Sequence, residues 1–296
     1  MLRARCVPRA GLVFEGSGPE VLGMAKTWFI TGTSRGFGRQ WAIAALERGD
    51  RVAATARNTE SLADLVKQYG EAILPIQLDV TDAAKARAAV DRAQAHFGRL
   101  DVVINNAGYG LFGFVEEVSE AQVRAQLETN FFGAVWITQA ALPHLRAQRS
   151  GHIIQVSSIG GITAFPGLSM YHASKWALEG FSQSLAQEVR AFGIHVTLIE
   201  PGGFDTDWSG SSADRVEPLA PYAEVGKAIA ERRKAAIGKR GNPAATRGPI
   251  LKVVDAAEPP LRVFFGPAPL EMAKADYASR LELWQKWQDV AIEANG

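Results

Sequence analysis

Cysteine is almost absent from this sequence, because Cys6 is the single cysteine among 296 residues. A lone cysteine excludes an intramolecular disulfide and any metal site built from a cysteine cluster. The histidines show no metal-ligand spacing either, so we expect no metal centre. No apolar run reaches the roughly 18–20 residues that a membrane-spanning helix needs. Together these absences predict a soluble protein of a reducing compartment, and we expect it to be cytoplasmic.

An excess of charge of one sign is also lacking, since 32 Lys and Arg residues face 31 Asp and Glu residues, a formal net charge of +1. This balance excludes a generally basic nucleic-acid binder and an acidic tail protein. The densest basic segment, residues 227–240, has no interleaved aromatic residue, and we interpret it as a solvated helix face. We therefore expect neither a nucleic acid nor a membrane as a partner.

Residues 1–23 lack any sustained hydrophobic period. The apolar run Leu12–Phe14 is far shorter than the core of a signal peptide, which needs about 7–15 residues. Glu15 and Glu20 disfavour a transit peptide, because such peptides avoid acids. Two interpretations stay open: a disordered N-terminal extension, or upstream sequence that precedes a true start at Met24.

From Lys26 onward, short apolar runs alternate with helical patterns. Strands are expected at residues 27–31, 51–56, 73–78, 102–105, 153–157, 194–199 and 261–265. Helices are expected between them, among them 41–48, 59–69 and one that Thr81 caps and that runs to about residue 97. Strands separated by helices of this length indicate a parallel sheet covered on both faces. The expected fold is α/β: a Rossmann-like, doubly wound parallel sheet of about seven strands, in one domain over residues 24–296.

A glycine-rich turn, TGTSRGFG at residues 31–38, follows the first expected strand. Gly32 permits the tight turn, Gly36 lets the backbone approach a pyrophosphate, and Gly38 lets the helix pack closely on the sheet. The N-terminus of that helix then offers unpaired N–H groups to an anion. Three glycines are often only a turn, but their place between the first strand and the first helix favours a dinucleotide-phosphate site.

An acid is missing where NAD-binding folds usually carry one. The second expected strand ends in the sequence ATARN at residues 54–58, so Arg57 stands beside the expected place of the acid. Arg35 adds a second guanidinium inside the glycine-rich turn. Either arginine alone is typical of a solvated surface, but two guanidinium groups without the acid suit a 2′-phosphate. The sequence therefore predicts NADP(H) in preference to NAD(H).

A tyrosine and a lysine lie four residues apart on an expected long amphipathic helix. Tyr171 and Lys175 share a helix face, so the phenol and the ammonium group are neighbours. A nearby cation lowers the pKa of a tyrosine from its usual value of about 10, which allows proton exchange near neutral pH. A pair at this spacing is common by chance. Ser158, thirteen residues upstream of Tyr171 at the end of a buried strand, makes chance a poor explanation.

With the sequence NNAG at residues 105–108 and with Asn130, this set resembles the short-chain dehydrogenase/reductase family, in the subtype whose loop reads TGxxxGxG. The resemblance is collinear from Lys26 to Thr206. It implies an enzyme that transfers a hydride reversibly between NADP(H) and a carbonyl/alcohol pair, with a hydrophobic small molecule as substrate. It also implies a homodimer or a homotetramer. The alternative is a non-catalytic dinucleotide sensor, which would keep the glycine-rich turn but lose the tyrosine or the lysine.

The resemblance also implies a role for each matching residue. Tyr171 would be the general acid/base, and Ser158 would hydrogen-bond the substrate oxygen. Lys175 would bind the nicotinamide ribose and lower the pKa of Tyr171, and Asn130 would hold a water of a proton relay. Together with Tyr171 and Lys175, the cofactor-binding residues would be Gly32, Thr33, Ser34, Arg35, Gly36, Phe37, Gly38, Arg57, Asp79, Val80, Asn106, Ala107, Gly108, Pro201, Gly202 and Thr206.

Residues 203–221 are rich in Gly, Ser and Pro and are predicted to form a substrate lid. Within this segment, Phe204 and Trp208 would offer apolar contacts to a substrate. Near the C-terminus, Trp284 and Trp287 are interpreted as packing residues.

Overall fold

The strands of the sheet lie where the apolar runs predict them. The computed structural model describes residues 25–235 and 240–296, so both interpretations of residues 1–23 concern a segment outside the described residues. One seven-stranded sheet has the order β3-β2-β1-β4-β6-β7-β9, and every neighbouring pair is parallel. Its strands are β1 (Thr27–Ile30), β2 (Arg51–Ala56), β3 (Ile73–Gln77), β4 (Val102–Asn105), β6 (Gly151–Val156), β7 (Ile194–Pro201) and β9 (Arg262–Phe265). A separate parallel pair joins β5 (Leu111–Phe112) to β8 (Asp214–Arg215).

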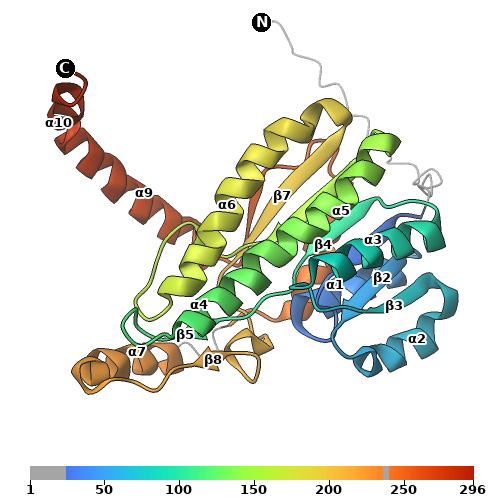
Figure 1. The fold of residues 1–296 in the computed structure, drawn as a ribbon, viewed down its shortest axis with the longest axis horizontal. Coiled ribbons are helices and arrows are strands. Elements are labelled where there is room, and N and C mark those ends of the chain that lie inside the picture. The colour runs from blue at the N-terminus through green and yellow to red at the C-terminus, as the bar shows by residue number, and fades with distance from the viewer. Residues whose placement is uncertain (1–24, 236–239) are drawn as a thin grey trace, which may run out of the picture.

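Helices cover both faces of the main sheet (Figure 1). Their bounds are α1 (Gly36–Glu47), α2 (Ala63–Tyr69), α3 (Ala83–Phe97), α4 (Glu120–Leu127), α5 (Gly133–Gln148), α6 (Ser169–Val189), α7 (Ala223–Ala235), α8 (Arg247–Asp255), α9 (Ala268–Lys286) and α10 (Gln288–Glu293). Because side chains alternate along a strand, neighbouring residues of β1 enter different cores. Phe29 packs with residues of α3, α5 and α6, whereas Trp28 and Ile30 pack with residues of α1 and α8. The predicted doubly wound Rossmann-like fold is confirmed.

The strand order reverses beside β1, which pairs with β2 on one side and with β4 on the other. In open parallel sheets, ligands bind outside the carboxyl ends of the strands at such a reversal. The glycine-rich turn follows β1, the segment 105–108 follows β4, and Ser158 follows β6. The topology therefore brings three separate sequence motifs to one edge of the sheet.

Three helix boundaries differ from the prediction. Helix α1 begins at Gly36 and not at residue 41; its first turn holds two glycines, which are poor helix formers and hide the start of the helix in the sequence. Residues 59–62 form a 3-10 turn that precedes α2. Asp82 caps α3 by accepting a hydrogen bond from the Lys85 N–H at 3.0 Å. The predicted cap, Thr81, is wrong because its hydroxyl donates to Asp79 at 2.8 Å instead.

The C-terminal helices leave the body of the molecule (Figure 1). Trp284 and Trp287 are 58% and 59% exposed, so their interpretation as packing residues is wrong. The sequence does not tell whether the same chain covers these two side chains. Among the described helices, none combines the length and the apolarity that a membrane span requires.

Candidate active site

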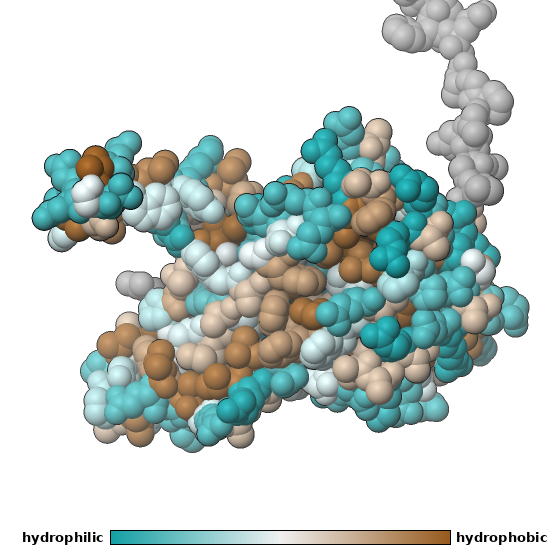
Figure 2. Space-filling view, turned by 45° about the horizontal axis from the view of Figure 1, so that its top comes forward, coloured by the Kyte–Doolittle hydropathy of each residue, from teal (hydrophilic) through white to brown (hydrophobic). Residues whose placement is uncertain are grey.

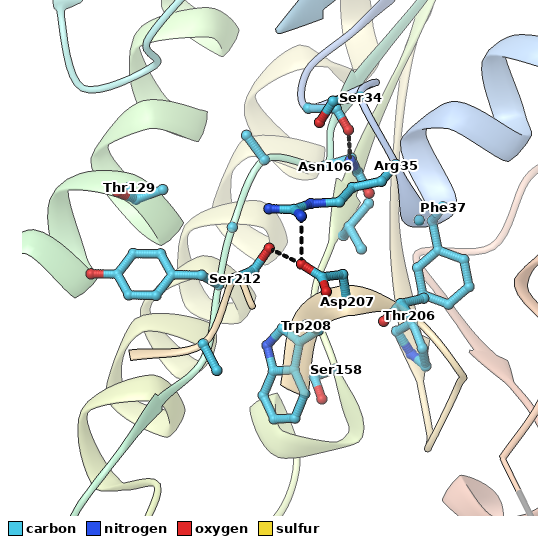
Figure 3. A pocket seen from close by; sticks show the side chains of 18 of the residues that line it. Ser34, Arg35, Phe37, Asn106, Thr129, Ser158, Thr206, Asp207, Trp208 and Ser212 are labelled. Carbon is cyan, nitrogen blue, oxygen red and sulfur yellow. Dashed lines mark hydrogen bonds and ion pairs between the residues drawn. The ribbon is translucent and has the colours of Figure 1, made fainter. Parts of the chain in front are cut away.

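A cavity of about 600 Å³ opens at the carboxyl ends of the central strands (Figure 3). It brings together most of the residues that the sequence singles out. Those on its wall are Gly32, Ser34, Arg35, Gly36, Phe37, Arg57, Asp79, Val80, Asn106, Ala107, Gly108, Ser158, Tyr171, Lys175, Pro201, Gly202 and Thr206. Thr33, Gly38 and Asn130 do not line the cavity and lie behind its wall.

The glycine-rich turn is fixed to the end of β4 by one side chain. The Asn106 amide donates to the Thr31 and Gly32 carbonyl oxygens at 2.9 and 3.0 Å. A Cβ on Gly38 would lie 2.5 Å from the Gly32 carbonyl oxygen and from Asn106 Nδ2, so only glycine allows this approach. Arg35, the N-cap of α1, makes no side-chain cap bond, which leaves the first N–H groups of the helix open to an anion. This arrangement fits the pyrophosphate of a dinucleotide.

Two arginines lie at the mouth of the cavity, and within the described residues only one of them forms an ion pair. The Arg57 side chain is exposed, and no ion pair joins it to an acid among residues 25–235 and 240–296. Arg35 Nη1 lies 2.7 Å from Asp207 Oδ2, across the mouth of the cavity (Figure 3). Asp207 also accepts a hydrogen bond from the Ser212 hydroxyl at 2.7 Å, the main reason that its pKa is lowered. The expected lid segment is thus tied to the glycine-rich turn by an ion pair.

Ser158, Tyr171 and Lys175 converge at the inner end of the cavity. Tyr171 lies on the first turn of α6, and the Lys175 Nζ atom stands over its ring, 5.9 Å from the centroid. Lys175 Nζ also donates to the Val156 carbonyl oxygen at 2.7 Å, which holds the lysine against the end of β6. The Ser158 hydroxyl accepts from the Gly160 N–H at 3.0 Å. The structure therefore brings together the three side chains that the sequence spacing singles out.

The pKa of the tyrosine is shifted in the direction opposite to the expectation. Burial raises the pKa of Tyr171 to about 12, and the hydrogen bond with Ser158 only partly opposes this. Burial lowers the pKa of Lys175 to about 8, with the charge of Glu179 acting in the opposite direction. The pKa of Tyr171 is thus raised overall in the protein alone, and a lowering contribution from Lys175 stays a prediction. The loss of water around the buried phenol outweighs the attraction of an ammonium group that stands over the ring.

Asn130 lies in a π-helical segment, Glu128–Phe132, between α4 and α5. Its Oδ1 accepts from the Tyr109 N–H at 3.0 Å. Its Nδ2 donates to the Tyr109 carbonyl oxygen at 3.0 Å and to the Ser174 hydroxyl at 3.1 Å. The Asn130 side chain therefore joins the loop after β4 to α6, directly behind Gly108. Its role in a proton relay stays a prediction.

Trp208 covers the tyrosine from the lid side. Its ring centroid lies 4.9 Å from that of Tyr171 and 5.2 Å from that of Phe112. A Cβ on Gly110 would come within 2.8 Å of the indole, so this glycine makes room for Trp208. Phe204 instead packs against Phe37, at 5.0 Å between centroids. Of the two aromatic residues expected to meet a substrate, Trp208 is the one beside Tyr171.

The cavity lies within a segment that matches a known family. Residues 26–217 match the family model described as short chain dehydrogenase. "Oxidoreductase BOA17" of Botryotinia fuckeliana (strain B05.10) is 46% identical over 273 residues, which cover 91% of this chain and 99% of that relative. This chain belongs to the short-chain dehydrogenase family. It is therefore an NAD(P)-dependent oxidoreductase that acts on CH–OH groups.

Solved short-chain dehydrogenases share the whole architecture. One from Streptomyces avermitilis superposes with a TM-score of 0.85 at 38% identity, and the match covers 92% of this chain and 98% of that one. Another, from Burkholderia cenocepacia J2315 in complex with NADP, gives a TM-score of 0.70 at 26% identity, with 88% and 97% covered. The nicotinamide dinucleotide of the family is thus consistent with the cradle described above.

Two residues of this short-chain dehydrogenase site escape prediction from the sequence. Asp207 forms an ion pair with Arg35. The sequence hints at this pair only by an acid in the expected lid segment and by two arginines, Arg35 and Arg57, in the expected cofactor site.

His172, the neighbour of Tyr171 in the sequence, is a second residue whose contacts the sequence does not reveal. It is buried: its Nδ1 lies 2.7 Å from the Gly160 carbonyl oxygen, and its Nε2 accepts from the Phe165 N–H at 2.9 Å. His172 therefore holds the loop that follows Ser158.

Proposed function

We propose that this enzyme catalyses reversible, NADP(H)-dependent hydride transfer between a ketone or aldehyde and the corresponding alcohol, on a hydrophobic small molecule. The observation that carries the proposal is the convergence of Ser158, Tyr171 and Lys175 in the cavity that the glycine-rich turn also lines. The apolar surroundings of Tyr171, which packs with Phe112, Leu168 and Trp208, support a hydrophobic substrate.

In the reductive direction, the bound nicotinamide supplies the hydride. Ser158 and Tyr171 hold the carbonyl oxygen by hydrogen bonds, and the Tyr171 hydroxyl donates its proton to that oxygen as the alkoxide develops. The raised pKa of Tyr171 keeps the phenol protonated near neutral pH, which suits a proton donor. The Lys175 ammonium stabilises the phenolate that remains and binds the ribose hydroxyls. Asn130 positions the loop behind Lys175 and supports the relay that returns a proton to Tyr171.

The preference for NADP(H) is part of the same proposal. Arg57 presents an exposed guanidinium at the end of β2, where an NAD-specific fold carries an acid. Arg35 supplies a second cation once it leaves Asp207. Apart from Thr33 and Gly38, the remaining predicted cofactor residues line the same cavity of about 600 Å³.

Residues 203–221 serve as the substrate lid in this proposal. Asp207 and Trp208 are consecutive, and one contacts the glycine-rich turn while the other covers Tyr171. A carbonyl compound reaches Tyr171 only when Trp208 moves aside or packs against the substrate. Substrate selection thus depends on this segment.

A panel of hydrophobic ketones and aldehydes, read by NADPH oxidation, tests the reaction. The Tyr171→Phe variant is expected to lose about 10²–10⁴-fold in turnover while it still binds NADPH, measured by fluorescence titration. Tyr222→Phe, which removes only a hydroxyl bound to Glu116, is the control that keeps full activity. Undiminished turnover in Tyr171→Phe contradicts the mechanism. NADPH binding without turnover of any carbonyl compound by the wild type supports the sensor alternative.

We also propose that the enzyme is a homo-oligomer held in part by its C-terminal arm, defined as residues 281–296. Every residue of the arm is exposed, and Figure 2 shows its hydrophobic residues standing clear of the body. The large apolar side chains are Leu281, Leu283, Trp284, Trp287, Val290 and Ile292. Exposed apolar patches mark interaction sites, and an isolated helix of this length is only marginally stable in water.

The charge of the arm favours a protein partner. Glu282, Asp289 and Glu293 outnumber Lys286, and such a surface is repelled by anionic lipid headgroups. A second copy of this chain, with a net charge near zero, meets no such repulsion. The double variant Trp284→Glu/Trp287→Glu is expected to lower the molar mass measured by light scattering, whereas Lys286→Glu on the polar side leaves it unchanged. An unchanged mass in the double variant contradicts an interface at the arm.

A further inference from the structure

A cluster of buried charges lies directly behind the active-site wall. Glu179 comes from α6, Glu200 from β7 and Arg262 from β9. Glu200 is 0% exposed, and Glu179 is also buried. Arg262 Nε lies 2.9 Å from Glu179 Oε2 and 3.4 Å from Glu200 Oε1, and its Nη2 donates to Gln183. One guanidinium therefore faces two carboxyl groups.

Three carboxyl oxygens of this cluster have no hydrogen-bond partner among the described residues: Glu179 Oε1 and both oxygens of Glu200. A buried carboxylate without compensation is costly, and two of them cannot both be neutralised by one cation. A single proton between the two groups removes the excess charge and supplies a donor to oxygens that otherwise only accept.

We infer that Glu179 and Glu200 share one proton near neutral pH, and that the pair thereby sets the charge of Lys175. This inference rests on the proposed function only where it concerns catalysis. Neither glutamate touches the reacting atoms, so both are positioning residues.

The link to the active site runs along α6 and through the end of β6. Glu179 follows Lys175 by one helical turn on the same face, and its negative charge raises the pKa of Lys175 against the effect of burial. A Cβ on Gly161 would meet both Ser157 Oγ and Glu179 Oε1, so the hydroxyl before Ser158 also faces the pair.

Glu200 and Lys175 titrate in the same range of pH. Burial and repulsion by Glu179 raise the pKa of Glu200 to about 8, and the pKa of Lys175 is also about 8. The charged and titratable groups that face the pair are Arg262 from β9, Lys175 from α6 and Ser157 from the end of β6. While Glu200 holds the proton, Glu179 is ionised and supports the Lys175 cation.

Unequal shifts of the pH–rate profile test this coupling. Activity is lost as pH rises through the pKa of Lys175, because the cation is needed. Glu179→Gln removes the supporting anion, so this alkaline limb is expected to move down by about one pH unit. Glu200→Gln leaves Glu179 ionised and removes only the second anion that Glu200 forms above about pH 8, so the limb is expected to move down by less. An equal shift in the two variants, or no shift in Glu179→Gln relative to the exposed control Glu188→Gln, overturns the coupling.

Two measurements without substrate or cofactor test the shared proton itself. The infrared spectrum of the wild type near neutral pH is expected to contain the C=O band of a protonated carboxyl group, which disappears as pH rises past about 8. The absence of that band overturns the inference even if the glutamine variants fail to fold.

The melting temperature gives the second measurement. The raised pKa of Glu200 provides stability that is complete below about 4.5 and is lost as pH rises to about 8. The fall of the melting temperature over this range is expected to be smaller in Glu200→Gln than in the wild type. Equal falls overturn the shared proton and leave the proposed reaction untouched.

Discussion

The two walls of the cavity are built differently. The inner wall is formed by Asn106, Ser158, Tyr171 and Lys175. Buried or part-buried hydrogen bonds hold Asn106 to the residue after β1, Lys175 to the end of β6 and Ser158 to the Gly160 N–H. The outer wall, formed by Arg35, Arg57, Asp207 and Trp208, depends on ring contacts and on an ion pair whose side chains are 49% and 28% exposed. Exposed ion pairs contribute about 0–1 kcal/mol, far less than a buried network. We therefore expect the reaction chemistry on the inner wall and the selection of ligands on the outer wall.

The largest effect on stability and on NADPH affinity is expected from a substitution in the glycine-rich turn beside the inner wall. Gly38→Ala places a methyl group 2.5 Å from the Gly32 carbonyl oxygen, and backbone cannot move aside as a flexible side chain does. We expect a loss of about 1–3 kcal/mol in the free energy of unfolding and a loss of more than tenfold in NADPH affinity. Thermal melts and fluorescence titration measure the two quantities.

The matched control lies in α6. A methyl group on Gly180 would have no atom within 4 Å, so Gly180→Ala is expected to be neutral or to stabilise by up to about 1 kcal/mol. Equal behaviour of the two variants contradicts the close approach at Gly38.

A tenfold or larger loss of NADPH affinity is expected from a substitution of Arg57 on the outer wall. A charge-assisted hydrogen bond is worth about 1.5–3 kcal/mol, so Arg57→Ala should weaken NADPH binding by roughly 10–100-fold and leave NADH binding unchanged. Arg39→Ala, which removes an arginine bound to Asp64 outside the cavity, is the control. Equal losses for both cofactors place the 2′-phosphate elsewhere.

The contrast between the walls also explains what the sequence could predict. The inner wall follows from local rules: a glycine-rich turn after a strand, two side chains one helical turn apart, and a serine at a fixed spacing before them. The parallel sheet then brings these motifs together at one edge. Most of the fold, and the convergence of the candidate catalytic residues in one cavity, can therefore be predicted without a structure.

Contacts between residues that lie far apart in the sequence cannot be predicted in this way. Arg35 and Asp207 meet only because the lid crosses the cavity, and no spacing rule joins them. Glu179, Glu200 and Arg262 come from three separate elements. The pKa of Tyr171 depends on its burial, which outweighs the neighbouring cation that the spacing reveals. Trp284 and Trp287 show that a sequence does not reveal whether the same chain covers an aromatic side chain.

The smallest effect is expected from Asp207, and its sign is informative. In the protein alone, the Asp207 carboxylate occupies the Arg35 guanidinium that we assign to the cofactor phosphate. Asp207→Asn keeps the shape of the side chain and removes the competing charge, so NADPH affinity should rise by up to about fivefold, the equivalent of about 1 kcal/mol. Asp205→Asn, an exposed neighbour, is the control and should have no effect. A fall in affinity shows instead that the ion pair persists in the bound state and that the outer wall closes over the cofactor. Both walls are then rigid when the enzyme is loaded, and selection depends on the rate at which the lid opens.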